Sequence, residues 1–211
     1  MEVNNGYTVA RECSCMPTRR SVWLIEKSGL GDQIEACTFE NYNATEKWQA
    51  YIKTMAVEFI KQSGRWFFIG GQVGCGKTHI CTAITGELIK LGKSSVYMLW
   101  MDEVTKIKAV KMDEVEYNRI IGKYKVTPVL YIDDFFKTER GKSPTTSDIN
   151  IAFEILNYRY NNKELITIIS SERSCDEILD IDEAIGSRIY QKCGEFKIAI
   201  AQDKKKNFRF R

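Results

Sequence analysis

Eight consecutive residues have the types and spacing of a loop that binds phosphate. They run Gly71-Gln-Val-Gly-Cys-Gly-Lys77-Thr78 and match the pattern G-x-x-x-x-G-K-[ST]. Glycines let main-chain amides turn toward an anion, and the N-terminus of a following helix adds a favourable field. In such a loop Lys77 reaches the β- and γ-phosphates, and the Thr78 hydroxyl binds Mg²⁺. The pattern predicts an ATP site whose binding residues are Gly71, Gln72, Val73, Gly74, Cys75, Gly76, Lys77, Thr78 and His79.

Two adjacent carboxylates, Asp133 and Asp134, follow the apolar run 129–132. Such a pair is usually a turn or a helix cap, but a phosphate-binding loop needs a carboxylate for Mg²⁺ at a nearby strand end. We expect Asp133 to orient Mg²⁺, mostly through water, and Asp134 to act as general base on the attacking water. Neighbouring residues of an extended chain point to opposite sides, so the two acids suit two different tasks.

Short apolar segments alternate with helical patterns along most of the chain. Strands are expected at 65–70, 95–100, 128–132, 165–170 and 195–201, and helices at 45–62, 77–91, 102–124, 147–160, 175–179 and 183–193. The alternation predicts one α/β domain over residues 44–211, with a parallel five-stranded sheet sandwiched by helices. Residues 1–43 are expected to be irregular. A strand and a charged helical segment separate the loop from the acid pair, as in ATPases whose sheet has an additional strand.

The composition of the 211 residues is that of a globular domain, with 44% apolar and 28% charged residues. Because no run of 18 apolar residues and no signal peptide occurs, we expect a cytoplasmic protein that does not contact a membrane. The seven cysteines are then reduced thiols rather than a disulfide framework. The net charge of +3 does not indicate nucleic acid by itself. Five cations fall within Lys204–Arg211, either as solvated chain or as a DNA contact.

Together these motifs resemble the DnaC/DnaI-type replicative helicase loaders, a branch of the AAA+ ATPases. The resemblance rests on residues 70–84 (GGQVGCGKTHICTAI), 129–137 (VLYIDDFFK) and 185–189 (IGSRI), and it extends from about Arg11 to Arg211. Phage- and prophage-encoded members, which are relatives of the IstB transposition helpers, are most similar. The resemblance implies an AAA+ P-loop NTPase fold without a large C-terminal helical lid. It also implies that the chain binds and hydrolyses ATP with Mg²⁺.

The same resemblance implies roles for further residues in ATP hydrolysis. It makes Asp133 and Asp134 the Walker B pair. It places Ser171 and Glu172 at sensor 1, where the family often has Asn against the attacking water. Arg209 falls at sensor 2. Without the family pattern, Ser171 reads as the cap of a following helix.

Arg188, within Gly-Ser-Arg-Ile, matches the arginine finger of the family, which acts on ATP held by a neighbouring subunit. Lys192 falls where some relatives carry a second basic residue. Alone, Arg188 on a short amphipathic helix is typical of a surface ion pair. The resemblance therefore implies self-association through an arginine-finger interface.

The sequence departs from the family pattern near its N-terminus. Full-length loaders carry an N-terminal helicase-binding domain, often with a cysteine cluster that can hold zinc. Residues 1–43 look like the trailing part of that region. The two thiols of the Cys13-Ser-Cys15 motif cannot complete a tetrahedral zinc site. The expected cofactors are ATP and Mg²⁺.

The leading hypothesis is an ATPase that helps place a DnaB-type hexameric helicase on single-stranded DNA. The basic residues that would track the DNA backbone are Lys137, Arg140, Lys142 and the segment Lys204–Arg211. Phe135, Phe136 and Phe208 are either stacking platforms for bases or core residues.

Three alternatives remain open. An IstB-like helper would act with a transposase instead of a helicase. A nucleoside monophosphate kinase would need an arginine-rich lid, which the sequence does not show. A nucleotide-dependent adaptor with little turnover fits two departures, which are Asp134 where many relatives of the wider superfamily have Glu, and the sensor 1 residues.

Overall fold

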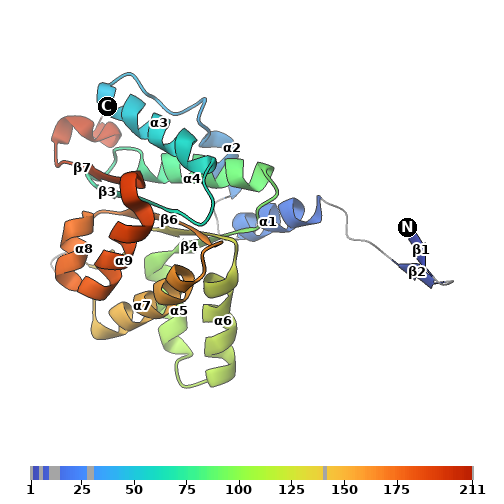
Figure 1. The fold of residues 1–211 in the computed structure, drawn as a ribbon. Coiled ribbons are helices and arrows are strands. Elements are labelled where there is room, and N and C mark those ends of the chain that lie inside the picture. The colour runs from blue at the N-terminus through green and yellow to red at the C-terminus, as the bar shows by residue number, and fades with distance from the viewer. Residues whose placement is uncertain (1, 5–6, 10–14, 28–30, 140–141, 211) are drawn as a thin grey trace.

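The computed structural model describes residues 2–4, 7–9, 15–27, 31–139 and 142–210. Its central feature is a five-stranded sheet in the order β4-β5-β6-β3-β7, with every neighbouring pair parallel (Figure 1). The strands are β3 (Trp66–Gly71), β4 (Ser95–Leu99), β5 (Val129–Asp133), β6 (Ile166–Ser171) and β7 (Lys197–Ile200). β6 lies between β3 and β5, so an additional strand does separate the two in the sheet, whereas the strand expected at 95–100 is β4 at the sheet edge. A separate antiparallel pair consists of β1 (Glu2–Asn4) and β2 (Tyr7–Val9).

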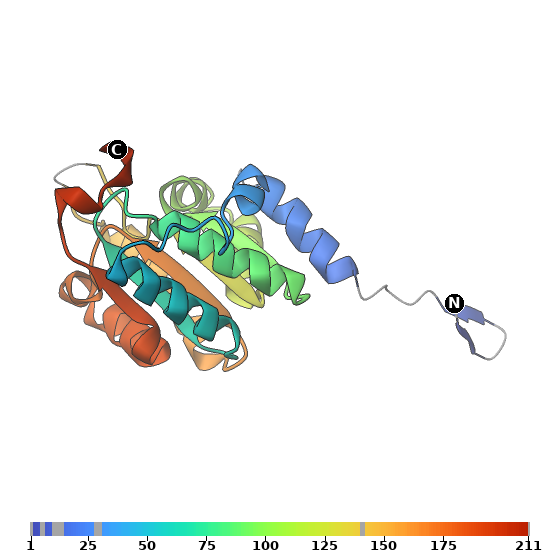
Figure 2. The same ribbon diagram turned by 90° about the horizontal axis from the view of Figure 1, so that it is seen from above.

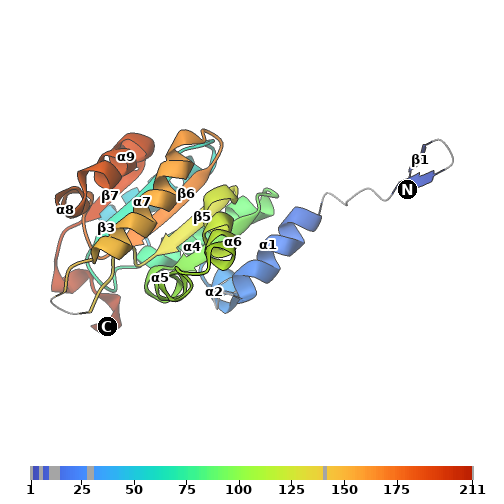
Figure 3. The same cartoon turned by 90° about the horizontal axis from the view of Figure 1, so that it is seen from below.

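Helices cover both faces of the sheet, as the alternating pattern predicts. On one face lie α3 (Lys47–Ile60) and α4 (Lys77–Lys90), which Figure 2 shows across the sheet in teal and green. Figure 3 shows the helices of the other face, which are α5 (Trp100–Ala109), α6 (Glu114–Val126), α7 (Thr146–Asn161), α8 (Cys175–Ile181) and α9 (Glu183–Cys193). Side chains alternate along β3. Phe67 packs in the core under α3 and α4, whereas Trp66 and Phe68 pack in the opposite core.

The expected strands lie within a few residues of the observed ones. The largest difference is at the last strand, expected at 195–201, because Gly194–Phe196 form a 3-10 turn before β7. The helix expected at 77–91 is α4, and Gly92 follows it with a φ of 78°. This positive φ is the conformation in which glycine commonly ends a helix.

The helical stretch expected at 102–124 is helical, but it consists of two helices rather than one. Residues 110–113 interrupt it between α5 and α6. The Asp113 carboxylate accepts a hydrogen bond at 3.0 Å from the amide of Glu116 and so caps a new helix. Asp113 stands inside a continuously charged segment, so its capping role was hidden in the sequence.

The expectation that residues 1–43 are irregular is wrong in part. α1 (Met16–Lys27) and α2 (Gly31–Ala36) form in this segment. Ile25 of α1 is fully buried and belongs to the core cluster that includes the apolar face of α4. Tertiary burial of such a residue stabilises a helix whose own sequence pattern is weak. Within the described ranges, none of the helices has the length and apolar character needed to span a bilayer.

Candidate functional site

The residues that could bind a nucleotide or take part in catalysis lie at the carboxyl edge of the sheet. β3, β5 and β6 run parallel and end at Gly71, Asp133 and Ser171. Their ends therefore lie side by side, at the edge where open α/β sheets bind ligands. The loop that follows β3 leads directly into α4.

Three glycines give the phosphate-binding loop its shape. Gly71, Gly74 and Gly76 have φ values of 107°, 71° and 92°. A Cβ atom at Gly71 would lie 2.0 Å from the main-chain oxygen of Ile200, so a larger residue would collide with β7. Gly76 immediately precedes the first residue of α4, whose first amides have no partner within the helix. The loop therefore forms a concave surface of main-chain amides that suits an anion.

Lys77 is almost buried, at 7% exposure, and its ammonium group lies against the loop itself. Nζ donates to the main-chain oxygens of Gly71 at 2.8 Å and Gln72 at 2.7 Å. Phosphate oxygens are stronger acceptors for an ammonium than neutral carbonyls are. The side chain is thus positioned to exchange these carbonyls for the phosphates of a nucleotide.

Asp133 is held by three hydroxyl groups from three different elements. Thr78 Oγ1 lies 3.3 Å from Oδ1, and the Tyr97 hydroxyl donates to Oδ2 at 3.1 Å. The Ser170 hydroxyl also donates to Oδ1. Burial and then the charge of Asp133 raise the pKa of Tyr97, so this phenol remains a proton donor. The carboxylate and the Thr78 hydroxyl present neighbouring oxygen atoms, the type of ligand that Mg²⁺ prefers.

Asp134 lies in a strained turn beside two further charges. Its φ is 54°, a conformation that residues with a Cβ rarely adopt. Lys137 Nζ donates to Asp134 Oδ2 at 2.8 Å and pairs with Glu172 Oε1 at 3.0 Å. Burial lowers the pKa of Lys137, but the hydrogen bonds to these two acids outweigh burial and the pKa is raised overall. Lys137 is therefore a cation held between two carboxylates.

The loop and this ion cluster line one cavity of about 240 Å³. Its lining residues are Val73, Gly74, Gly76, Lys77, Thr78, His79, Asp134, Lys137, Glu172 and Arg209. A second, more apolar cavity of about 300 Å³ shares Gly74, Gly76 and His79 and adds the rings of Tyr42 and Phe208. A polar cavity with lysines beside an apolar one with aromatic rings can take the phosphates and the planar base of one nucleotide.

Comparison with known proteins assigns the family. Residues 35–193 match the family described as the bacterial DnaA ATPase domain, which is most of this chain. The chain belongs to that family.

Two relatives from Bacillus subtilis (strain 168) are similar to this DnaA-type ATPase domain. YqaM is 34% identical over 209 residues, which cover 93% of this chain and 65% of YqaM. The phage-like element PBSX protein XkdC is 30% identical over 206 residues, which cover 93% of this chain and 76% of XkdC. The chain thus spans less than two thirds of the length of YqaM.

Solved structures confirm the AAA+ fold. The DnaC helicase loader has a TM-score of 0.64 at 20% identity, covering 81% of this chain and 99% of that chain. AMPPCP-bound DnaA from Aquifex aeolicus has a TM-score of 0.63 at 23% identity, covering 83% of this chain and 53% of that chain. The resemblance to DnaC/DnaI-type loaders is confirmed, and the family is one of replication-related ATPases.

In this AAA+ domain the structure does not bring Ser171 into the cavity. Ser171 is fully buried, and its hydroxyl donates to the main-chain oxygen of Phe135 at 2.7 Å. Its neighbours on either side supply the polar groups instead, since Ser170 contacts Asp133 and Glu172 lines the cavity. Sequence reasoning missed Ser170. The alternation of side chains along a strand was the signal that could have found it.

Arg188 lies on α9, outside the cavity. Its Nε donates to Asn157 Oδ1 at 3.1 Å, and one terminal nitrogen donates to the main-chain oxygen of Ala184 at 2.7 Å. The guanidinium also lies over the Phe153 and Tyr160 rings, with centroids at 5.0 and 5.3 Å. Arg188 therefore does not act on this chain's own cavity, and its role toward a neighbouring subunit stays a prediction. Arg209, by contrast, lines the cavity.

The aromatic residues proposed to stack on DNA divide into two groups. Phe135 and Phe136 are fully buried against Trp100, so the stacking interpretation is wrong for these two. Phe208 is half-buried and stacks on Trp48 with ring centroids 6.2 Å apart.

Some predicted residues lie outside the described ones, namely Cys13, Arg140 and Arg211. Among the residues that are described, no group of three His, Cys, Asp or Glu side chains is arranged to hold a metal ion. A magnesium ion bound with a nucleotide needs only one or two protein ligands, because phosphates and water supply the others.

Proposed function

We propose that this chain is a Mg²⁺-dependent ATPase of the helicase-loader type, which helps place a replicative DNA helicase on single-stranded DNA. The observation that carries the proposal is one cavity in which Lys77, Thr78 and Asp134 meet, with Asp133 hydrogen-bonded to Thr78. The fold similarity to the DnaC helicase loader and the membership of a replication-related ATPase family support the choice of partner.

The residues at the cavity suit an ATP·Mg²⁺ complex. Thr78 and Asp133 would hold Mg²⁺, which when bound neutralises charge on the transferred phosphoryl group. The loop amides and Lys77 would orient the β- and γ-phosphates. The Tyr97 and Ser170 hydroxyls fix both oxygens of Asp133 and so set the direction in which this carboxylate meets the ion.

Asp134 is placed to handle the proton during hydrolysis. A water oxygen would bond to the γ-phosphorus while the bond from that phosphorus to the β–γ bridging oxygen breaks, leaving ADP and phosphate. Asp134 would accept the proton that the water releases. Its carboxylate lines the cavity, so it can reach a water beside the terminal phosphate.

The experiment that tests the proposal compares ATP binding and turnover in three proteins. Lys77→Met should weaken Mg·ATP binding by roughly tenfold or more, because a charge-assisted contact to phosphate is lost. Asp134→Asn should bind ATP like wild type yet lose hydrolysis. Addition of single-stranded DNA and a DnaB-type helicase should raise the rate of ATP hydrolysis by the wild-type chain. Failure of the wild-type chain to bind Mg·ATP would refute the proposal.

An adaptor with little turnover is the second candidate, and the Lys137 ion pair favours it. Lys137 Nζ lies 2.8 Å from Asp134 Oδ2, so the proposed base is engaged by a cation. Under this interpretation Asp134→Asn leaves an already low ATPase rate unaltered, even with helicase and DNA present. The same measurement thus separates a motor from an adaptor.

A further inference from the structure

Lys137 connects two loops that leave neighbouring strands. Its ammonium lies 2.8 Å from Asp134 Oδ2 after β5 and 3.0 Å from Glu172 Oε1 after β6. All three residues line the cavity that contains Lys77 and Thr78. On this side of the cavity, opposite the loop that carries Lys77, one cation therefore bridges two anions.

The backbone that carries Lys137 is fixed by the core. Phe135 and Phe136 stack on each other at 4.1 Å between ring centroids, and both are fully buried. Asp134 and Phe136 both have positive φ, at 54° and 57°. Such strain persists only where the surroundings enforce it. The Lys137 amide closes the turn by donating to the Asp134 oxygen at 2.9 Å, so the turn returns the lysine side chain to the cavity.

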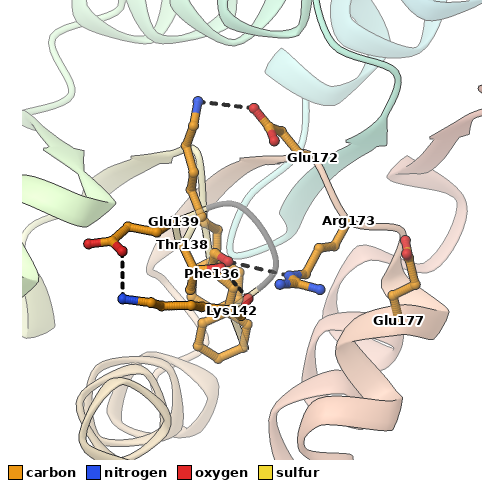
Figure 4. Close-up of a pocket in the computed structure, with 9 residues that line it drawn as sticks. Phe136, Thr138, Glu139, Lys142, Glu172, Arg173 and Glu177 are labelled. Atoms are coloured by element: carbon orange, nitrogen blue, oxygen red, sulfur yellow. Dashed lines mark hydrogen bonds and ion pairs between the residues drawn. The ribbon is translucent and has the colours of Figure 1, made fainter. Parts of the chain in front are cut away.

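The Lys137 side chain keeps freedom that its backbone lacks. The side chain is 38% exposed and is held by two carboxylates rather than by packing. It also borders a neighbouring cavity of about 250 Å³. Figure 4 shows that cavity, with Glu172, Arg173 and Glu177 facing Thr138, Glu139 and Lys142. The ammonium can therefore change partners without a change in the fold.

A triphosphate changes the charge balance at this cluster. Asp134 and Glu172 would repel the terminal phosphate of ATP, whereas Lys137 would attract it. The γ-phosphate carries more charge than a single carboxylate, and ADP presents no group at that position. The ammonium thus has a competing partner in the triphosphate state only.

We propose that Lys137 is a positioning residue that responds to the terminal phosphate. With ADP it holds Asp134. With ATP it moves to the γ-phosphate and leaves Asp134 free to accept a hydrogen bond from the attacking water. This inference rests on the proposed ATPase function and assigns the step that makes Asp134 available.

The test measures dissociation constants for Mg·ATP and Mg·ADP together with kcat. Lys137→Gln should weaken ATP binding roughly tenfold, a loss of one charged contact, and leave ADP binding within about twofold. Its kcat should fall. Lys137→Arg should restore most of the preference for ATP, because the charge is kept. If Lys137 only linked the two loops, its replacement would weaken the affinities for ATP and ADP equally.

Lys90→Gln is the matched control. Lys90 also forms an ion pair with an acid three residues away, Glu87, at 2.6 Å, but it lies in the last turn of α4. Its removal should leave the ratio of ATP to ADP affinity unaltered.

Equal losses of ATP and ADP affinity in Lys137→Gln would overturn the proposal, as would a higher kcat. If Lys137→Gln does not fold, an unchanged affinity ratio with normal kcat in Lys137→Met would overturn it equally. A wild-type chain that binds neither nucleotide would show instead that the ATPase function itself is absent.

Discussion

At the residue scale, Ser170 connects Asp133, the last residue of β5, with Asp134. Its hydroxyl donates to Asp133 and accepts from the amide of Asp134 at 3.2 Å. Ser170→Ala should raise the Mg²⁺ concentration for half-maximal ATP binding by roughly tenfold, because a carboxylate that binds metal loses a group that orients it. A titration with Mg²⁺ at fixed ATP, followed by a fluorescent nucleotide, measures this change.

Thr105→Ala is the control for that titration. Thr105 is an exposed hydroxyl on α5 that donates to the Met101 main-chain oxygen at 2.8 Å. It should not alter the Mg²⁺ requirement. If Ser170→Ala and wild type need the same Mg²⁺ concentration, Ser170 does not orient the carboxylate that holds the metal ion.

The residues of the site differ in how far the sequence could reveal them. Lys77, Thr78 and Asp133 belong to contiguous motifs whose residue types follow directly from phosphate and metal chemistry. Ser170 and Lys137 depend on which way a side chain points from a neighbouring strand or from a strained turn. The family resemblance pointed to Ser171, whereas alternation along β6 directs the Ser170 hydroxyl to Asp133. The direction of Lys137 follows from the packing of its turn.

At the element scale, Arg159 joins α7 to two other elements from inside the core. It is fully buried and donates to Thr167 Oγ1 and to the main-chain oxygens of Tyr124, Lys125, Thr127 and Ile166. Burial lowers the pKa of Arg159 to about 9, so the group is still charged at neutral pH. It thereby satisfies carbonyls where α6 ends and β6 begins.

Arg159→Leu should reduce the free energy of unfolding by roughly 3 kcal/mol or more, because several buried carbonyls lose their donor. Urea unfolding measures this loss. Arg119→Leu is the matched control, since Arg119 pairs with Glu116 on the exposed surface of α6. Similar unfolding midpoints for the two variants would contradict a structural role for Arg159.

The segment after β7 contacts the phosphate-binding loop. The Asp203 amide donates to Gln72 Oε1 at 2.9 Å, and the Phe208 amide donates to the Gly74 oxygen at 2.9 Å. A Cβ atom at Gly74 would lie 2.1 Å from Asn207 Oδ1. The loop and this segment therefore share one surface.

Gly74→Ala should displace residues 203–209 and speed tryptic cleavage at Lys204–Lys206 several-fold, because the added methyl group collides with Asn207. Mg·ATP should protect the wild-type segment and protect the variant less. Gly122→Ala is the control, because a Cβ atom there meets nothing within 4 Å. Identical cleavage rates in all three proteins would show that the contact has no bearing on the loop.

Elements were predictable where burial dictates the pattern. The central strands β3, β5 and β6 are buried on both faces and appear in the sequence as apolar runs, so their positions along the chain could be predicted. α1 was not predictable, because its helix depends on burying Ile25 in a core built by residues far along the chain. The break at Asp113 was missed because a capping aspartate resembles any other charged residue in a charged segment.

At the scale of the whole molecule, the position of Arg188 bears on assembly. The side chain is held by Asn157 and Ala184 on the helical face formed by α7 and α9, and it does not line this chain's own cavity. An arginine that completes a site must then do so on another subunit. In that arrangement each active site uses Lys77 from one chain and Arg188 from the next.

Mixing two inactive variants tests this arrangement. Lys77→Met and Arg188→Ala should each lose helicase- and DNA-stimulated turnover, while Arg188→Ala keeps its affinity for ATP. A mixed assembly contains interfaces in which the Arg188→Ala chain supplies Lys77 and the Lys77→Met chain supplies Arg188. If subunits mix at random, an equimolar mixture should regain about a quarter of the wild-type rate. Asn157→Ala, which only releases Arg188, should keep the stimulated rate. An inactive mixture would show that Arg188 supports its own fold and does not complete a neighbour's site.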